Sequence, residues 1–263
     1  MNNNSLPIGI FDSGIGGLTV VRALRRILPK ESIVYLGDTA RVPYGNKSHA
    51  TIQRYAMQAG GILANYNPKL MVVACNTASA HGLTALQAIS DCPVMGVIEP
   101  GAEAASTVMG AVGVIGTLAT IQSLAYEKAI RNRNSNAIIH SLACPLLVSL
   151  AEEGWLDDPI TDAVCRRYLD QMPLNVSTIV LGCTHYPVLL QSLSRARPNT
   201  SWLDSGELTA KTVKHLLQNN IGLCTSGTRG KLKILLTDAS SRLKEVGERF
   251  LSEDLEAITL IDF

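Results

Sequence analysis

Short runs of β-branched and other apolar residues recur along the whole chain, and segments with helical periodicity separate them. The nine runs read IGIF, SIVYLG, LMVVAC, VMGVI, VGVIG, AIIHSLA, TIVLGC, LKILLT and AITLID. Most are apolar on both faces, which is typical of strands in a parallel sheet that helices cover on both sides. Between them, residues 18–28 and 51–63 place their apolar side chains on one helical face. The alternation predicts an α/β fold built from parallel sheets.

Two pairs of matching segments suggest that an α/β unit is duplicated. The segments that begin at Ile8 (IGIFDSG) and Val112 (VGVIGTLAT) both read as a strand, a glycine, a small polar residue and a helix. The strand ends ACNTASA and GCTHYP repeat at nearly the same offset, with Cys75 and Cys183 in matching positions. Few identical residues accompany this spacing, so the spacing alone does not decide whether the unit is duplicated. A length of 263 residues is compatible with one large domain or with two domains of ordinary size.

The domain boundary is predicted at GVIEPGA, residues 96–102, where proline and glycine end a strand. After residue 205 the pattern reads helix, a loop rich in glycine, serine and threonine, then strand, helix and strand. We expect this last segment to pack back onto the first half. The predicted domains are therefore residues 1–97 plus 206–263, and residues 98–205.

Charge and composition narrow the expected partners. The formal net charge is +1, so no overall field favours nucleic acid or an anionic membrane surface. No apolar run approaches the roughly 18 residues of a membrane span, and the N-terminal residues lack the basic and apolar regions of a signal peptide. We therefore expect a cytoplasmic protein. None of its six cysteines forms a C-x-x-C pair, so they are expected to stay reduced.

Cys75 and Cys183 each end a predicted strand, at the edge of a parallel sheet where ligands bind. Each is followed by two polar residues, namely Asn76 and Thr77, and Thr184 and His185. Each is predicted to lead into a helix, whose N–H groups suit an anion and whose dipole lowers a thiol pKa. A cysteine in such a place is more often a small buried hydrophobe, but the matching flanks favour a functional pair. The other four cysteines lack these flanks and are predicted to be structural.

Two further segments are candidates for the same sheet edge. FDSGIGGLT places Asp12 and Ser13 at the end of the first strand, where they either cap the next helix or set a carboxylate beside a thiol. Its glycines lack the G-x-G-x-x-G spacing and give only a weak resemblance to a dinucleotide loop. The segment GDTARVPYGNKS, residues 37–48, could cover a ligand, although a surface connection is the favoured interpretation.

Taken together, eight blocks resemble the cofactor-independent aspartate/glutamate racemase family. They are FDSGIGGLTV, YLGDTARVPYG, ACNTASA, GVIEPG, GVIGTLATI, ACPLLVSLAEEG, LGCTHYPVL and LDSGELTA. The resemblance covers the chain in order from residue 8 to about 210 and is loose over the last fifty residues. It implies two similar parallel-sheet α/β domains related by pseudo-two-fold symmetry, with the active site in the cleft between them.

The resemblance also implies a reaction, the interconversion of L- and D-glutamate by a glutamate racemase that supplies D-glutamate for peptidoglycan synthesis. It implies a small-molecule substrate, no pyridoxal phosphate and no metal ion, and it is compatible with a homodimer. A racemase of aspartate or of another amino acid is the nearest alternative within the family. The GDTARVPYG segment favours glutamate.

By the same resemblance, Cys75 and Cys183 lie on opposite faces of the substrate, where Cys183 deprotonates L-glutamate and Cys75 deprotonates D-glutamate. Asp12 matches the acid that assists Cys75. His185 matches the imidazole that assists Cys183, and Glu152 matches a further family carboxylate. The positions that match substrate-binding residues are Asp12, Ser13, Pro43, Tyr44, Gly45, Asn76, Thr77, Thr117, Thr120, Thr184 and His185. Ser149 stands where the family pattern has proline, which concerns the local loop and not the chemistry.

The residues alone are also compatible in part with three other classes of protein. A cysteine–histidine hydrolase would pair Cys183 with His185, but their two-residue separation is poor for a triad and Cys75 would be idle. A zinc site built on the same three residues would lack a fourth ligand. A two-lobed binding protein without catalysis would need neither cysteine.

Overall fold

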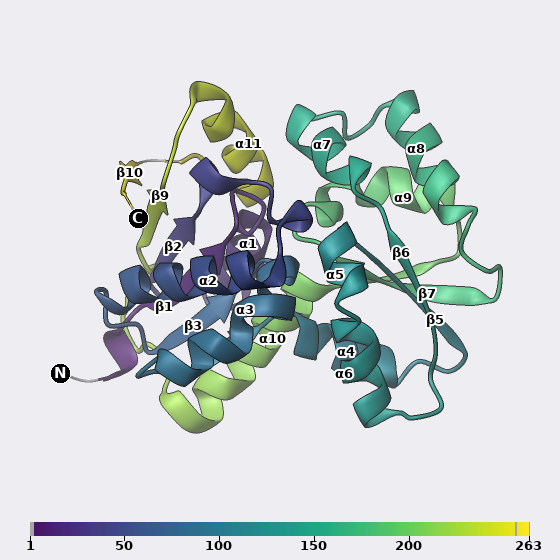
Figure 1. Cartoon of the computed structure of the whole chain (residues 1–263). Helices are drawn as coiled ribbons and strands as arrows, with labels where there is room; N and C mark the ends of the chain where they lie inside the picture. Colours follow the sequence, from purple (N-terminus) through teal and green to yellow (C-terminus); the bar gives the residue numbers. More distant parts are fainter. Residues whose placement is uncertain (1–2, 256, 263) are drawn as a thin grey trace.

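The chain folds into two parallel sheets, each with helices packed around it. The computed structural model describes residues 3–255 and 257–262. The larger sheet has the strand order β10-β9-β2-β1-β3-β4, and the smaller has the order β6-β5-β7-β8. The two sheets lie in separate lobes (Figure 1). In the lobe that holds the N-terminus, the C-terminal strand β9 lies beside β2, and β10 lies beyond β9 at the edge of the sheet. All strand pairs in both sheets are parallel, which confirms the predicted fold class.

The elements follow each other in near-regular strand–helix alternation. The strands are β1 Ile8–Asp12, β2 Ile33–Gly37, β3 Leu70–Val73, β4 Val94–Gly96, β5 Ala111–Gly116, β6 Ile138–Ala143, β7 Val176–Gly182, β8 Ser201–Asp204, β9 Leu232–Leu236 and β10 Ile258–Leu260. The helices are α1 Leu18–Ile27, α2 His49–Ala64, α3 Asn76–Ile89, α4 Ile98–Ser106, α5 Leu118–Gln122, α6 Ala125–Arg133, α7 Leu146–Glu153, α8 Pro159–Leu169, α9 Leu190–Ala196, α10 Ser205–Leu216 and α11 Ser241–Leu251.

The strand order shows the duplication that the spacing suggested. In each sheet the first four strands of the unit run in the order second, first, third and fourth: β2-β1-β3-β4 and β6-β5-β7-β8. Val73 pairs with Phe11 in the first sheet, and Leu181 pairs with Ile115 in the second. Cys75 and Cys183 each stand two residues past these paired positions, at the carboxyl ends of equivalent strands.

Each of the nine predicted apolar runs contains a strand, and the structure adds a tenth, β8. The pattern did not predict β8 because its four residues, Ser201–Asp204, include only two apolar side chains and so form no apolar run. The outer strands β6 and β10 were predicted, but they are not buried on both faces. A sheet edge has one neighbouring strand and less cover, which relaxes the apolar pattern there.

The connection between the two sheets differs from the expected strand break. β4 ends at Gly96, and Pro100 and Gly101 lie in the first turn of α4. Proline is accepted in a first turn because its missing N–H would have no partner there. The strand β9 pairs with β2 of the larger sheet, and β10 pairs with β9. The exact domain limits, residues 1–97 plus 206–263 and residues 98–205, stay a prediction.

Candidate active site

A cavity of about 430 Å³ lies between the two lobes, at the carboxyl ends of strands from both sheets. Twelve of the fourteen predicted site residues line it. They are Ser13, Pro43, Tyr44, Gly45, Cys75, Asn76, Thr77, Thr117, Glu152, Cys183, Thr184 and His185. The other two, Asp12 and Thr120, are buried directly behind this lining. Residues from both sheets thus meet at one cavity, although more than 100 positions separate the two cysteines.

Several lining residues were not predicted. Val42, Leu118, Leu146 and Val148 give the cavity an apolar side, and Ser149 lies beside Glu152 on α7. Leu118 and Leu146 are large hydrophobic side chains that stay exposed in the first turns of their helices. The sequence alone does not distinguish such a leucine from an ordinary core residue, because the exposure of its side chain depends on where the opposite lobe lies.

Cys75 caps the helix that follows it, but its thiol is not activated as the sequence suggested. Its Sγ accepts a hydrogen bond from the Ala78 backbone N–H at 3.4 Å, at the N-terminus of α3. Burial is nevertheless the largest influence and, with the nearby Asp12 carboxylate, raises the pKa of the Cys75 thiol to about 12. The Ala78 N–H at the start of α3 lowers this pKa as expected, but burial and Asp12 outweigh it, so Cys75 is a protonated thiol at neutral pH.

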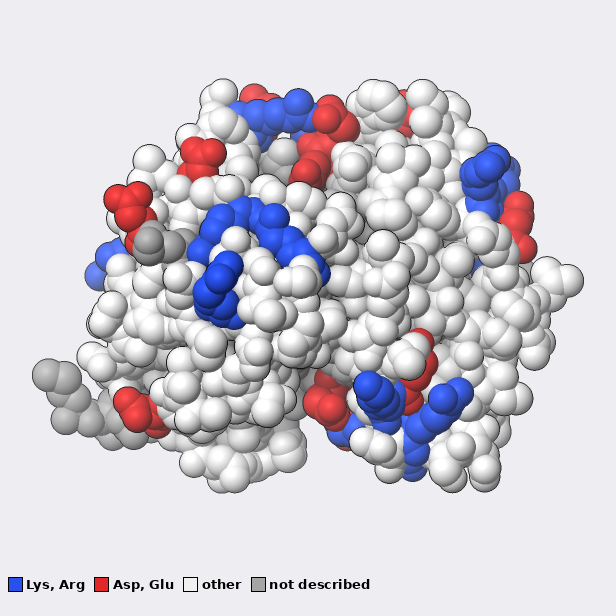
Figure 2. All heavy atoms as spheres, in the orientation of Figure 1, with Lys and Arg blue, Asp and Glu red and all other residues white. Residues whose placement is uncertain are grey.

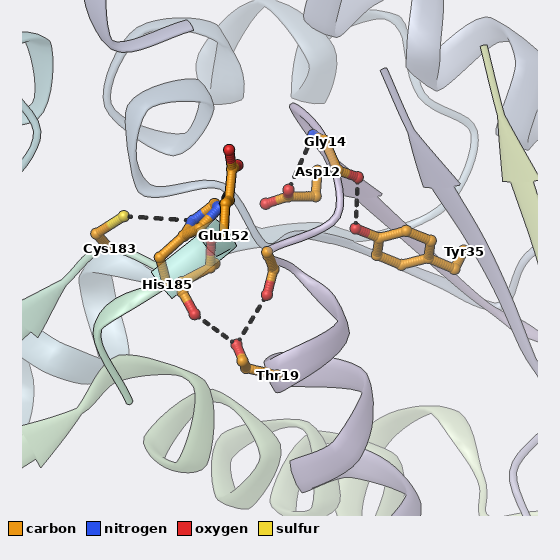
Figure 3. Close-up of polar contacts among 9 residues, drawn as sticks. Asp12, Gly14, Thr19, Tyr35, Glu152, Cys183 and His185 are labelled. Carbon is orange, nitrogen blue, oxygen red and sulfur yellow. Dashed lines mark hydrogen bonds and ion pairs between the residues drawn. The ribbon is translucent and has the colours of Figure 1, made fainter. Parts of the chain in front are cut away.

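Asp12 ends β1 with its side chain fully buried (Figure 3). Its Oδ2 accepts a hydrogen bond from the Gly14 N–H at 3.0 Å, while Oδ1 has no hydrogen-bond partner. The hydroxyl of Tyr35 donates to the Gly14 carbonyl at 2.8 Å and holds the turn from the other side. Burial raises the pKa of Asp12 from its ordinary value, against the lowering effect of His185. A buried carboxylate with a free oxygen is poised to take part in proton transfer.

The raised pKa predicts that Asp12→Asn gains stability while it loses activity. Ionisation of Asp12 is less favourable in the folded chain, so its cost is absent below the unfolded pKa and grows as the pH rises above it. We expect the Asn variant to unfold at a higher temperature near neutral pH, because it removes this cost of ionisation. Thermal unfolding at several pH values checks this, and the gain should shrink on acidification. A lower midpoint at neutral pH would contradict it.

We call the residues around each cysteine a half-site. In the second half-site, around Cys183, three side chains lie in a row (Figure 3). Cys183 Sγ lies 3.8 Å from His185 Nδ1, and His185 Nε2 lies 2.9 Å from Glu152 Oε1. Burial alone would lower the pKa of His185, but the contacts with Cys183 and Glu152 outweigh it and raise this pKa to about 10. The hydrogen bond from His185 lowers the pKa of Glu152. At neutral pH the row therefore holds an imidazolium between the sulfur and a carboxylate.

The chain after Cys183 differs from the expected helix start. A single 3₁₀ turn, Tyr186–Leu189, comes first, and α9 begins only afterwards. The Cys183 carbonyl accepts from the Tyr186 N–H at 3.2 Å. Thr19 on α1 donates to the Thr184 carbonyl at 2.9 Å, which fixes the segment against the first lobe. The two half-sites thus share a topology but differ in local structure, and the imidazole takes the place of the helix dipole at Cys183.

Three threonine hydroxyls join the lobes at one side of the cavity. Thr77 Oγ1 lies 2.9 Å from that of Thr117 and 3.1 Å from that of Thr120, and the last two are 3.0 Å apart. Thr77 lies on α3 of one lobe, while Thr117 caps α5 of the other. Such hydroxyls can turn to donate to a carboxylate between the lobes.

The segment 37–48 is not the surface connection that was favoured. Tyr44 is buried, and its hydroxyl donates to the buried carboxylate of Asp38. Asp38 also accepts from Arg41 Nε at 2.6 Å and from Thr237 Oγ1 at 3.1 Å. Pro43, Tyr44 and Gly45 are thereby held as part of the cavity wall. The segment covers the site, as the less favoured interpretation proposed.

Within residues 3–255 and 257–262, no group of three or more His, Cys, Asp or Glu side chains has the geometry to hold a metal ion. No helix in the same residues is long and apolar enough to cross a membrane. Figure 2 shows positive and negative side chains interspersed over one face, with wide uncharged areas between them.

Comparison with known proteins decides the family. Residues 13–213 match the model of the Asp/Glu/Hydantoin racemases. The chain belongs to this racemase family. A glutamate racemase from Geobacter metallireducens is 46% identical over 252 residues, which cover 94% of this chain and 93% of that protein. One from Thermus thermophilus is 44% identical over 258 residues, 98% and 97% of the two chains.

Solved structures of the same family agree with the fold. A glutamate racemase from Francisella tularensis in complex with D-glutamate superposes with a TM-score of 0.93, at 38% identity over 99% of this chain and 98% of that one. An allantoin racemase from Klebsiella pneumoniae, at 19% identity and a TM-score of 0.61, shares the racemase fold. The Francisella tularensis structure superposes over nearly the full length of both chains, so the two proteins share the same fold.

Proposed function

We propose that this racemase interconverts L- and D-glutamate by a two-base mechanism, with Cys75 and Cys183 as the two acid/base groups. The observation that carries the proposal is that two equivalent strand ends bring both thiols to one cavity between the lobes. Inversion at a carbon needs a base on one face and an acid on the other. A duplicated fold supplies both without moving either group, and general acid–base catalysis requires such fixed positions.

The charge states of the site residues suit one direction of proton transfer. Cys75 carries a proton because its pKa is about 12, and His185 is an imidazolium because its pKa is about 10. The imidazolium Nδ1 lies 3.8 Å from the Cys183 sulfur. Cys183 can then take the Cα proton of L-glutamate, and Cys75 can give its own proton to the opposite face. The reverse reaction begins from the opposite protonation of the two thiols.

The Cα–H bond is far less acidic than a thiol, so the site must stabilise the developing negative charge. Backbone N–H groups at the start of α3 and the hydroxyls of Ser13, Thr77, Thr117 and Thr184 surround the cavity. Their donors can bind both carboxylates of glutamate, and preorganised donors in a site with little water stabilise such charge most effectively. The D-glutamate bound to the Francisella tularensis enzyme supports this choice of ligand.

Glutamate racemisation is tested by incubating the protein with each enantiomer of glutamate in D₂O, after dialysis against EDTA. We expect the optical signal to decay while one deuterium enters at Cα, because the proton returned to the opposite face comes from solvent-exchanged thiol. Aspartate enantiomers in parallel test the nearest alternative substrate. A folded protein that exchanges neither amino acid would favour a binding function, and activity lost only after EDTA treatment would favour a metal.

The proposal extends to the setting of the enzyme. It places the protein in the cytoplasm, as a source of D-glutamate for peptidoglycan, and as a homodimer. Analytical ultracentrifugation with and without glutamate tests the oligomeric state, and the cell-wall role is tested by whether D-glutamate restores growth of a strain that lacks the gene.

A further inference from the structure

One face of α11 packs against the half-site of Cys183, although α11 follows β9 of the other sheet. The residues on this face are Arg242, Val246, Arg249 and Phe250, at helical positions i, i+4, i+7 and i+8. A second cavity, of about 280 Å³, lies between α11 and α7. Figure 1 shows the two helices facing each other across the seam between the lobes.

Phe250 contacts the imidazole of His185 directly. The two ring centroids are 5.2 Å apart and the planes meet at 86°, so the rings pack edge to face. Phe250 is fully buried. This geometry is a favoured aromatic contact and restricts the plane of the smaller ring. The direction in which His185 presents Nδ1 to the Cys183 sulfur therefore depends on α11.

Arg242 lies beside the other end of the same row and lines the second cavity together with Glu152. Its guanidinium forms an ion pair with Glu153, the residue next to Glu152 on α7. The hydrogen bond from His185 lowers the pKa of Glu152 most, and burial opposes it. The charge of His185 and then the charge of Arg242 lower this pKa further. The Glu152 side chain is 47% exposed and lines both cavities, so packing alone does not fix its carboxylate.

Arg249 closes the contact between the two helices at the end of α7. Gly154 ends α7 with a φ of +79°, and a Cβ at this position would lie 2.7 Å from the Arg249 guanidinium. Glycine thus serves both the left-handed backbone and the close approach of α11. Two contacts thus link α11 to α7, Arg242 with Glu153 and Arg249 beside Gly154, while Phe250 contacts His185.

We propose that α11 positions the His185–Glu152 pair, with Arg242 and Phe250 as positioning residues for proton transfer at Cys183. The inference rests on the proposed racemase function. It means that the second half-site is complete only when the C-terminal helix of the first lobe is docked. Neither residue lines the main cavity, so both act through Glu152 and His185 and not on the substrate.

The charges around Glu152 predict in which direction its pKa changes when Arg242 is replaced. His185 faces it from the turn after β7, Arg242 from α11 and the Asp12 carboxylate from the end of β1. Loss of the Arg242 charge raises the pKa of Glu152, because a positive neighbour that favours the carboxylate is gone. The acid limb of the pH profile of kcat then moves to higher pH.

The test compares Arg242→Gln with Lys244→Gln, both measured on the full-length protein with L-glutamate. Lys244 is the matched control, since it loses the same charge from the same helix but pairs with Glu248 and not with α7. We expect Arg242→Gln to lower kcat about three- to tenfold with little change in KM, and to move the acid limb up by roughly 0.3–0.5 pH unit, as for an exposed charge pair. High salt should shrink the difference from wild type.

A charge exchange separates positioning from general damage to the fold. Arg242→Glu should lower kcat further than Arg242→Gln, and adding Glu153→Arg should restore most of the loss because the ion pair forms again. Phe250→Leu should lower kcat although circular dichroism shows that the variant is as fully folded as the wild type.

Three outcomes would overturn the inference: an Arg242→Gln enzyme with wild-type kcat and pH profile, an equal effect of Lys244→Gln, or a charge exchange that restores nothing. A wild-type protein that does not racemise glutamate would instead overturn the proposed function.

Discussion

Cys75→Ala and Cys183→Ala are each expected to lose at least about 10³-fold in the rate of glutamate racemisation, because each removes the acid/base group from one face of Cα. Both thiols line the cavity and end equivalent strands. The remaining thiol can still exchange a proton on its own face. In D₂O we therefore expect Cys183→Ala to exchange the Cα proton of D-glutamate without inversion, and Cys75→Ala to do the same with L-glutamate. Mass and optical measurements on one sample separate exchange from inversion.

Cys165→Ala is the matched control for these variants. Cys165 is also fully buried, but it lies on α8 and does not line the cavity. It should lose some stability through the small cavity it leaves and keep its turnover number. Full racemisation by either Cys75→Ala or Cys183→Ala would exclude the two-base mechanism.

Gly16→Ala is expected to lower kcat about 10- to 100-fold by displacing His185. A Cβ at position 16 would lie 2.5 Å from His185 Nδ1 and 2.5 Å from Thr184 Oγ1, which no real packing allows. The imidazole must then move away from Cys183 Sγ, from which Nδ1 is now 3.8 Å distant. Overpacking of this kind costs about 1–3 kcal/mol, so unfolding and turnover are measured on the same preparation.

Gly61→Ala provides the opposite case. Gly61 lies inside α2, and a Cβ there meets nothing within 4 Å. We expect this variant to be about 0.5–1 kcal/mol more stable, because alanine loses less backbone entropy in a helix, with unchanged kcat. If Gly16→Ala turned over like Gly61→Ala, the contact between the turn before α1 and His185 would have no part in catalysis.

The fold class and most of the lining residues could be predicted from the sequence because both depend on local patterns. Apolar runs identify buried strands, and the carboxyl ends of parallel strands identify the edge where a site forms. Cys75, Asn76 and Thr77 follow one such end, and Cys183, Thr184 and His185 follow its equivalent. The strand β8 was not predicted because its residues, SWLD, contain only two apolar side chains and form no apolar run.

The interpretation of segment 37–48 failed for a different reason. Its polar residues are typical of a surface loop, but Asp38 is buried by contacts with Tyr44 and with Thr237, which is almost 200 residues away. A contact between segments so far apart leaves no trace in a local pattern. The same holds for Arg242 and Phe250, whose partners on α7 and at position 185 come from the other lobe.

The sequence by itself determined the two parallel α/β units and the two cysteines at equivalent strand ends, since these follow from periodicity and spacing along the chain. Only the tertiary structure decided how the two thiols differ. Burial beside Asp12 raises the pKa of Cys75 to about 12, while Cys183 faces an imidazolium held by Glu152 and α11. The physical reason is that a thiol's protonation depends on the charges and solvent around it, and distant segments supply both only after the chain has folded.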